Sequence, residues 1–192
     1  MRYLATRALL LSTLLLGCSG SVDSRTRLSI FAASSLTDSF QALASEFEAQ
    51  NPSIAVELAF AGSQILRLQI EQGASVDLFA SANQKHLQEL VDDGYMGSPK
   101  VFASTDLVMI IPIANPAEIE TFEDLTKASR IVLGNEFSPI GLYTLEILER
   151  ATADLGASFG SVVSERIASL ENNVRMVRAK VELGEADAAL VY

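Results

Sequence analysis

The sequence is poor in the residues that build disulfides and metal centres. It contains one cysteine, Cys18, and one histidine, His86. A single cysteine cannot form a disulfide within the chain, and one cysteine with one histidine excludes the common zinc ligand sets. The sequence also lacks a Walker-type phosphate loop and the G-x-S-x-G turn of the α/β hydrolases.

Basic residues are scarce as well. The 192 residues include 14 Lys and Arg against 24 Asp and Glu, a net charge of −10 at pH 7. This balance argues against nucleic acid as a partner and against a basic membrane-facing surface. It does not exclude an anionic ligand, because neutral dipoles in a closed cleft act locally, whereas surface charge is screened beyond about 8 to 10 Å.

The first 17 residues have the pattern of an export signal. Arg2 and Arg7 form a short basic region. The apolar run that follows, 8–16, is about nine residues, shorter than the ~20 that cross a bilayer as a helix. We therefore expect a signal peptide at 1–17 and a protein of the periplasm or cell envelope.

The segment Leu15-Leu16-Gly17-Cys18 resembles the lipobox of bacterial lipoproteins. This resemblance implies that Cys18 is acylated and begins the mature chain, with 18–27 as lipidated N-terminus and tether. The alternative is an ordinary signal peptide with an incidental cysteine.

After the tether, short apolar strands alternate with amphipathic helical patterns. This alternation predicts an α/β fold with parallel-rich sheets and helices on both faces. We expect two lobes, 28–105 and 106–192, with 156–170 as a connection that contains a helix. The predicted strands are 28–32, 54–60, 77–81, 107–112, 131–134 and 188–192, and the predicted helices are 36–50, 64–72, 83–93, 141–155 and 174–183.

Four predicted helices begin directly after a strand end or a short loop, near Ser35, Ser63, Ile140 and Val174. Each helix start offers free backbone N–H groups at a positive helix end, and the two serines add hydroxyl donors. In open α/β sheets such turns line the crevice beyond the carboxyl ends of the strands. Four of them converging from two lobes would bind an anion without a lysine or arginine. The simpler interpretation is that each serine only caps its helix.

Six short segments occur in order along the chain: FAASSLTD at 31–38, FAGSQ at 60–64, GASVDLFASAN at 73–83, PIGLY at 139–143, NVR at 173–175 and AALVY at 188–192. Together they resemble the bacterial periplasmic molybdate-binding proteins of molybdate ABC transporters. The resemblance implies the two-lobed type II periplasmic binding protein fold, with the ligand in a cleft between the lobes. It also implies a non-enzymatic receptor, without a cofactor, that hands molybdate or tungstate to an ABC permease subunit in the inner membrane. We expect a monomer.

Carried over residue by residue, the resemblance places five ligand contacts in this chain. They are the hydroxyls of Ser35, Ser63 and Tyr192 and the main chain of Ile140 and Val174. Ile140 departs from the family, which usually has alanine there. The family also continues beyond this tyrosine through a segment that returns to the first lobe, so the sequence predicts that a C-terminal segment is missing and that the chain is a fragment.

Molybdate suits a site made only of donors, because it is fully deprotonated at neutral pH and its oxygens only accept. Three alternatives stay open at this point. The first is a receptor for sulfate or another small oxyanion, which only pocket size would distinguish. The second is a hydrolase with Ser34 or Ser35 as nucleophile. The third is a fragment that lacks the returning segment and cannot close on a ligand.

Other polar residues receive simpler interpretations. His86 falls on the helix face opposite Leu87 and Leu90, which predicts a solvated surface residue. Arg175 and Arg178 lie one turn apart on the last predicted helix, and we expect them on an exposed helix face. The alternative roles for these two side chains are a bridge between the lobes or a contact with the permease. Asp77, Asp187 and the pair Asp92 and Asp93 are expected to be solvated or to cap strands and helices.

Overall fold

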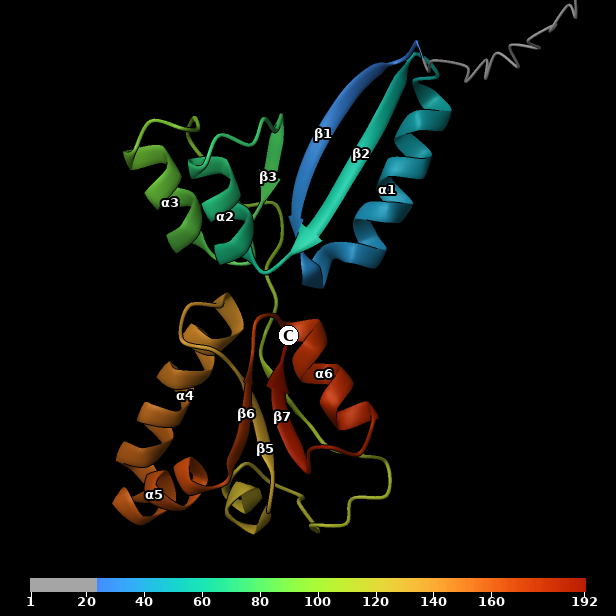
Figure 1. Ribbon diagram of the computed structural model, residues 1–192. Helices are drawn as coiled ribbons and strands as arrows, with labels where there is room; N and C mark the ends of the chain where they lie inside the picture. Colours follow the sequence, from blue (N-terminus) through green and yellow to red (C-terminus); the bar gives the residue numbers. More distant parts are fainter. Residues whose placement is uncertain (1–23) are drawn as a thin grey trace, which may run out of the picture.

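The computed structural model describes residues 24–192; the predicted signal peptide and Cys18 lie outside the described residues. The chain forms two α/β lobes, shown one above the other in Figure 1. The first lobe continues to α3, the segment 93–107 runs between the lobes, and the second lobe begins at β4. The predicted lobe boundary, 105/106, falls within this connecting segment.

The first lobe is built on a parallel sheet with strand order β2-β1-β3. In Figure 1, α1 lies on one face of this sheet and α2 and α3 on the other. The elements are β1 (Thr26–Ala33), the 3₁₀ helix η1 (Ser34–Leu36), α1 (Thr37–Gln50), β2 (Ile54–Ala61), α2 (Ser63–Glu71), β3 (Leu78–Ala80) and α3 (Gln84–Asp92).

The second lobe has the strand order β4-β7-β5-β6, in which β4 runs antiparallel to β7 and the other pairs are parallel. Helices α4 and α5 cover one face and α6 the other (Figure 1). The elements are β4 (Val108–Ile110), the 3₁₀ helix η2 (Glu123–Lys127), β5 (Ile131–Gly134), α4 (Pro139–Leu155), α5 (Ala157–Glu165), β6 (Ile167–Glu171), α6 (Val174–Glu182) and β7 (Ala188–Val191).

Local sequence explains where the helices of the second lobe begin and end. Ser138 caps α4 by accepting a hydrogen bond from the Gly141 N–H (3.1 Å), and Pro139 occupies the first helical position, where no N–H is needed. Gly156 ends the helix with φ +100°, a left-handed value that favours glycine. Asn173 caps α6 in the same way as Ser138 caps α4.

The packing follows the alternation of side chains along the strands. In β5, Ile131 and Leu133 face a buried cluster with α5, whereas Val132 faces a second buried cluster with α6. In the first lobe, the buried cluster of Leu66, Ile70, Phe79 and Leu90 lies on the α2 and α3 side of the sheet. No residue of α1 is fully buried.

The strands and helices predicted from sequence are confirmed to within two residues at each end. Three elements are new: the 3₁₀ helices η1 and η2, and strand β6 inside the segment expected to be a helix-containing connection. Strand β6 forms the edge of the sheet, and its apolar Leu170 is 57% exposed while the polar Glu171 is buried. An edge strand with this inverted pattern carries no alternation that predicts it. None of the helices within residues 24–192 is long and apolar enough to cross a membrane.

Candidate functional site

A small cavity lies between the lobes, at the carboxyl ends of β1 and β2 and the amino ends of α4 and α6. All five residues assigned from sequence line it: Ser35 and Ser63 from the first lobe, and Ile140, Val174 and Tyr192 from the second. The remaining lining residues are Ala33, Ser34, Ala61, Gly62, Ala82, Pro139 and Asn173. No Lys, Arg, Asp or Glu side chain is among them, so this space offers dipoles and no formal charge.

Ser63 begins α2 and is 1% exposed. Its Oγ already accepts a hydrogen bond from the Ala82 N–H at 3.0 Å. A hydroxyl has one proton to donate, and with Oγ engaged as an acceptor that proton is free to point into the cavity. The loop after β3 thereby sets Ser63 up as a donor.

The second lobe contributes two helix starts. Ile140 and Val174 lie in the first turns of α4 and α6, where backbone N–H groups have no partner within the helix. The caps of both helices take N–H groups further along: Ser138 accepts from Gly141, and Asn173 accepts from Met176 (3.1 Å). The earlier N–H groups therefore remain available at the positive ends of the helices.

Tyr192 closes the cavity. Its hydroxyl oxygen is buried and has no hydrogen-bond partner within the described residues 24–192. Burial raises the pKa of the Tyr192 phenol well above its usual value, and the neighbouring Tyr143 adds to the rise. The phenol therefore stays neutral and keeps its proton. A buried donor without a partner is costly, so this hydroxyl is a candidate donor to an acceptor in the cavity.

Ser34 and Ser35 differ in exposure. Ser34 is 7% exposed and Ser35 is exposed, although both line the cavity. The sequence reasoning did not assign Ser34 or Asn173 to the ligand site. Neither carries a sequence signal that separates a lining residue from a helix cap.

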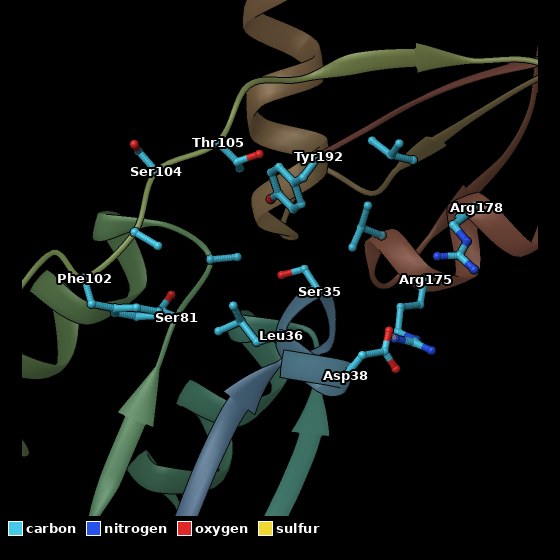
Figure 2. A pocket seen from close by; sticks show the side chains of 14 residues that line it. Ser35, Leu36, Asp38, Ser81, Phe102, Ser104, Thr105, Arg175, Arg178 and Tyr192 are labelled. Carbon is cyan, nitrogen blue, oxygen red and sulfur yellow. Dashed lines mark hydrogen bonds and ion pairs between the residues drawn. The ribbon is translucent and has the colours of Figure 1, made fainter. Parts of the chain in front are cut away.

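A larger cavity of about 380 Å³ adjoins the small one and shares Ser35, Ala82, Val174 and Tyr192 with it. Figure 2 shows Ser35 and Tyr192 reaching into this space from opposite lobes, with Arg175 beside Asp38 at its rim. The Arg175 guanidinium and the Asp38 carboxylate are 3.0 Å apart and join α6 to α1. Arg175 is thus both exposed and a bridge between lobes, whereas Arg178 pairs with Glu182 on its own helix.

The prediction for His86 is wrong. The side chain is 4% exposed, and its Nε2 lies 3.0 Å from the carbonyl oxygen of Phe137 in the second lobe. The helical period placed His86 opposite the apolar face of α3, but the surface that buries it belongs to a segment 51 residues away. Local periodicity carries no information about such a neighbour.

The expectation for Asp187 also needs correction in part. Asp187 is 6% exposed rather than solvated, and it accepts the N–H groups of Ser129 and Arg130, both at 2.9 Å. Asp77 is exposed and accepts the Ser29 N–H at 2.8 Å. Both carboxylates fix loops next to strands and lie outside the cavity.

The geometry gives the hydrolase alternative no support. A serine nucleophile needs a base within hydrogen-bond reach, and His86 is not among the residues that line the cavities around Ser34 and Ser35. Its Nε2 is engaged with Phe137 instead. Within residues 24–192, no group of three His, Cys, Asp or Glu side chains is placed to hold a metal ion.

Comparison with known proteins gives the family. Residues 28–192 match the model of the bacterial extracellular solute-binding proteins. The chain belongs to this family. Over 165 residues it is 36% identical to the molybdate-binding protein ModA of Mycobacterium tuberculosis (strain H37Rv), covering 85% of this chain and 59% of that protein. It is 32% identical over 187 residues to ModA of Haemophilus influenzae, covering 93% and 71%.

The fold comparison agrees with the family. The sulfate-binding protein SubI of Mycobacterium tuberculosis superposes with a TM-score of 0.73 at 18% identity, covering 88% of this chain and 65% of that structure. The predicted two-lobed periplasmic binding protein fold is confirmed. This solute-binding protein spans about three fifths of the length of the first of its curated relatives.

Proposed function

We propose that this solute-binding protein captures molybdate, or its close analogue tungstate, and delivers it to an ABC importer. The hydroxyls of Ser35, Ser63 and Tyr192 and the backbone N–H groups of Ile140 and Val174 are the proposed donors. The observation that carries the proposal is the buried Tyr192 hydroxyl, neutral and without a partner within residues 24–192, at a cavity whose other polar groups also donate. The names of the two ModA relatives support molybdate as the ligand.

The chemistry of the cavity favours a fully deprotonated oxyanion. A phosphate that still carries a proton needs an acceptor, and no carboxylate lines the small cavity. Hydrogen bonds to a charged partner contribute about 1.5 to 3 kcal/mol each, so several together support tight binding once the cost of closing the lobes is met. The protein acts in this proposal as a receptor and not as an enzyme.

A thermal-shift experiment tests the ligand. Molybdate or tungstate at a hundred times its Kd should stabilise the purified protein by about 2.7 kcal/mol, which raises Tm by roughly 5 to 11 °C. Phosphate at the same concentration should not change Tm. If molybdate and tungstate also leave Tm unchanged, the proposal is wrong.

Sulfate is the second candidate ligand. It is tetrahedral and fully deprotonated like molybdate but smaller, and SubI shows that this fold also occurs in a sulfate-binding protein. Competition calorimetry, with sulfate added before molybdate, distinguishes the two. We expect sulfate to compete weakly; equal competition would make the protein a general receptor for tetrahedral dianions.

The lipid anchor and the partners are part of the same proposal. We infer that Cys18 is acylated, that the protein stays at the cell envelope as a monomer, and that an ABC permease subunit receives the ligand. The support for the anchor is the Leu15-Leu16-Gly17-Cys18 segment behind a short apolar run. A Cys18→Ser substitution should move the protein from the membrane fraction to the soluble fraction, and membrane attachment that survives it would contradict the anchor.

A further inference from the structure

Besides the exposed Arg175–Asp38 ion pair, two buried hydrogen bonds join the lobes outside the candidate ligand contacts. The Gln64 side-chain Nε2 donates to the carbonyl oxygen of Asn172 at 2.8 Å, and the His86 Nε2 lies 3.0 Å from the carbonyl oxygen of Phe137. Gln64 lies in the first turn of α2 and His86 in the first turn of α3, both in the first lobe. Both acceptors are backbone atoms of the second lobe.

The two acceptors occupy equivalent places. Asn172 comes directly before Asn173, which caps α6, and Phe137 comes directly before Ser138, which caps α4. These helices supply Val174 and Ile140 to the small cavity. The bond from Gln64 therefore holds the loop before α6, and the bond from His86 holds the loop before α4. Each loop positions the first turn of its helix next to the proposed anion.

The side chains of Asn135 and Asn172 connect the two loops within the second lobe. Asn135 Nδ2 donates to Asn172 Oδ1 at 2.7 Å, and Asn135 Oδ1 accepts from the N–H groups of Phe137 (3.1 Å) and Ser138 (2.9 Å). A continuous series of hydrogen bonds thus runs from Gln64 through the second lobe to His86. These bonds tie the loop before α4 to the loop before α6.

The contacts are close and shielded from solvent. Gln64 is 8% exposed and His86 is 4% exposed. A Cβ on Gly62 would lie 2.5 Å from Asn172 O, so this position needs glycine to let the lobes approach. Because a carbonyl only accepts, His86 Nε2 carries the proton of this bond, and Nδ1 faces Glu89 Oε2 at 3.4 Å.

We propose that Gln64 and His86 form a closure latch, a pair of positioning residues that hold α4 and α6 over the bound anion without touching it. This inference rests on the proposed function. The latch bonds exist only when the lobes are together, so they contribute nothing to the first encounter of the ligand with an open cleft. Their loss should therefore speed ligand dissociation and leave association nearly unchanged.

The test measures molybdate affinity by calorimetry and dissociation by stopped flow in the full chain and its variants. Gln64→Met and His86→Phe keep most of the side-chain volume and remove the donor. Each should weaken binding about three- to tenfold, the range of one neutral hydrogen bond, through faster dissociation. The Gln64 Oε1 atom is buried without a partner within residues 24–192, so methionine there removes an unsatisfied acceptor together with the donor.

Two matched variants separate donation from packing. His86→Gln keeps a donor on a side chain of similar reach and should stay within about threefold of the wild type, above His86→Phe in affinity. Gln69→Met changes an exposed glutamine on the same helix as Gln64 and should leave affinity unchanged.

Three outcomes contradict the proposals, and they are distinguishable. If the wild type binds molybdate and both donor-free variants bind equally well, the latch is wrong. If His86→Gln loses as much affinity as His86→Phe, the shape of the imidazole matters and donation does not, which also overturns the latch. If the wild type binds neither molybdate nor tungstate, the proposed function fails, and the latch fails with it.

Discussion

The two lobes differ in how their sheets are covered. The second lobe has a buried cluster on each face, one with α5 and one with α6. In the first lobe the buried cluster lies on the α2 and α3 side, while on α1 Leu43 is 61% exposed and Phe47 40% exposed. Burial of apolar surface is the main stabilising contribution, and within residues 24–192 α1 has no buried residue, unlike α4, α5 and α6 of the second lobe.

The lobes also differ in the donors they bring to the cavity. The donors proposed for the first lobe are the side-chain hydroxyls of Ser35 and Ser63, whereas those proposed for Ile140 and Val174 of the second lobe are backbone N–H groups. A side-chain donor is lost when its residue changes, but a backbone donor survives most substitutions. Both proposed donors of the first lobe therefore depend on residue identity, whereas the second lobe combines two backbone donors with one side-chain donor, the Tyr192 hydroxyl.

Paired leucine substitutions test the difference in packing most strongly. Leu125→Ala removes a side chain that is 1% exposed in the second lobe and should lower the free energy of unfolding by about 2 to 5 kcal/mol. Leu43→Ala, on exposed α1, should lower it by about 0.5 kcal/mol or less. Urea unfolding measures both. Equal losses would show that α1 is packed as firmly as the second lobe.

Ser63→Ala tests the side-chain donors. The variant removes a hydroxyl whose acceptor site is already occupied by Ala82 N–H, so we expect molybdate affinity to fall by about 1.5 to 3 kcal/mol, roughly 10- to 150-fold. Ser161→Ala, on an exposed turn of α5, is the control and should bind as the wild type does. Calorimetry gives the two affinities, and unchanged binding by Ser63→Ala would remove this serine from the site.

Ile140→Val tests the backbone donors. The residue is 1% exposed, so removing one methylene should cost about 0.5 to 1.5 kcal/mol of stability. Because its proposed contact is the N–H group, affinity should change by no more than about threefold. An affinity loss as large as that of Ser63→Ala would mean that the Ile140 side chain shapes the pocket.

The smallest effect concerns pH and the contact between the lobes. Burial lowers the pKa of His86 below its usual value; the hydrogen bond to Phe137 opposes this shift, and the charges of Arg67 and Lys85 add to it, while Glu89 faces Nδ1. Between this lowered pKa and about 6.5, the His86 side chain binds more protons in the unfolded chain than in the folded protein. The contribution of His86 to the free energy of unfolding therefore rises with pH through that window and is constant above it.

The corresponding measurement compares Tm at pH 7.5 and pH 5.0. The wild type should lose more stability on acidification than His86→Gln, which has no group to protonate at that position. The difference between the two proteins isolates His86 from carboxylates that titrate at lower pH. Identical pH dependence would show that His86 is as easily protonated in the folded protein as in the unfolded chain.

The sequence predicted the parts of this molecule that depend on neighbours along the chain. Strand and helix patterns placed Ser35, Ser63, Ile140 and Val174 at helix starts, and the resemblance to a family selected Tyr192. Contacts between distant segments were not predictable. The burial of His86 comes from Phe137, and the position of Gln64 depends on Asn172, 108 residues later. Strand β6 was missed because its apolar Leu170 is exposed and its polar Glu171 is buried, the reverse of the alternation that predicts a strand.

The absence of charged side chains around the small cavity has a consequence for the complex as a whole. The proposed dianion adds two negative charges to the protein, and a site without Lys, Arg, Asp or Glu side chains offers no such group whose change of protonation would offset them. Empty and filled forms of one chain should therefore migrate differently in native electrophoresis and elute separately from an anion exchanger. The ligand would then be visible as a change in the mobility of its carrier.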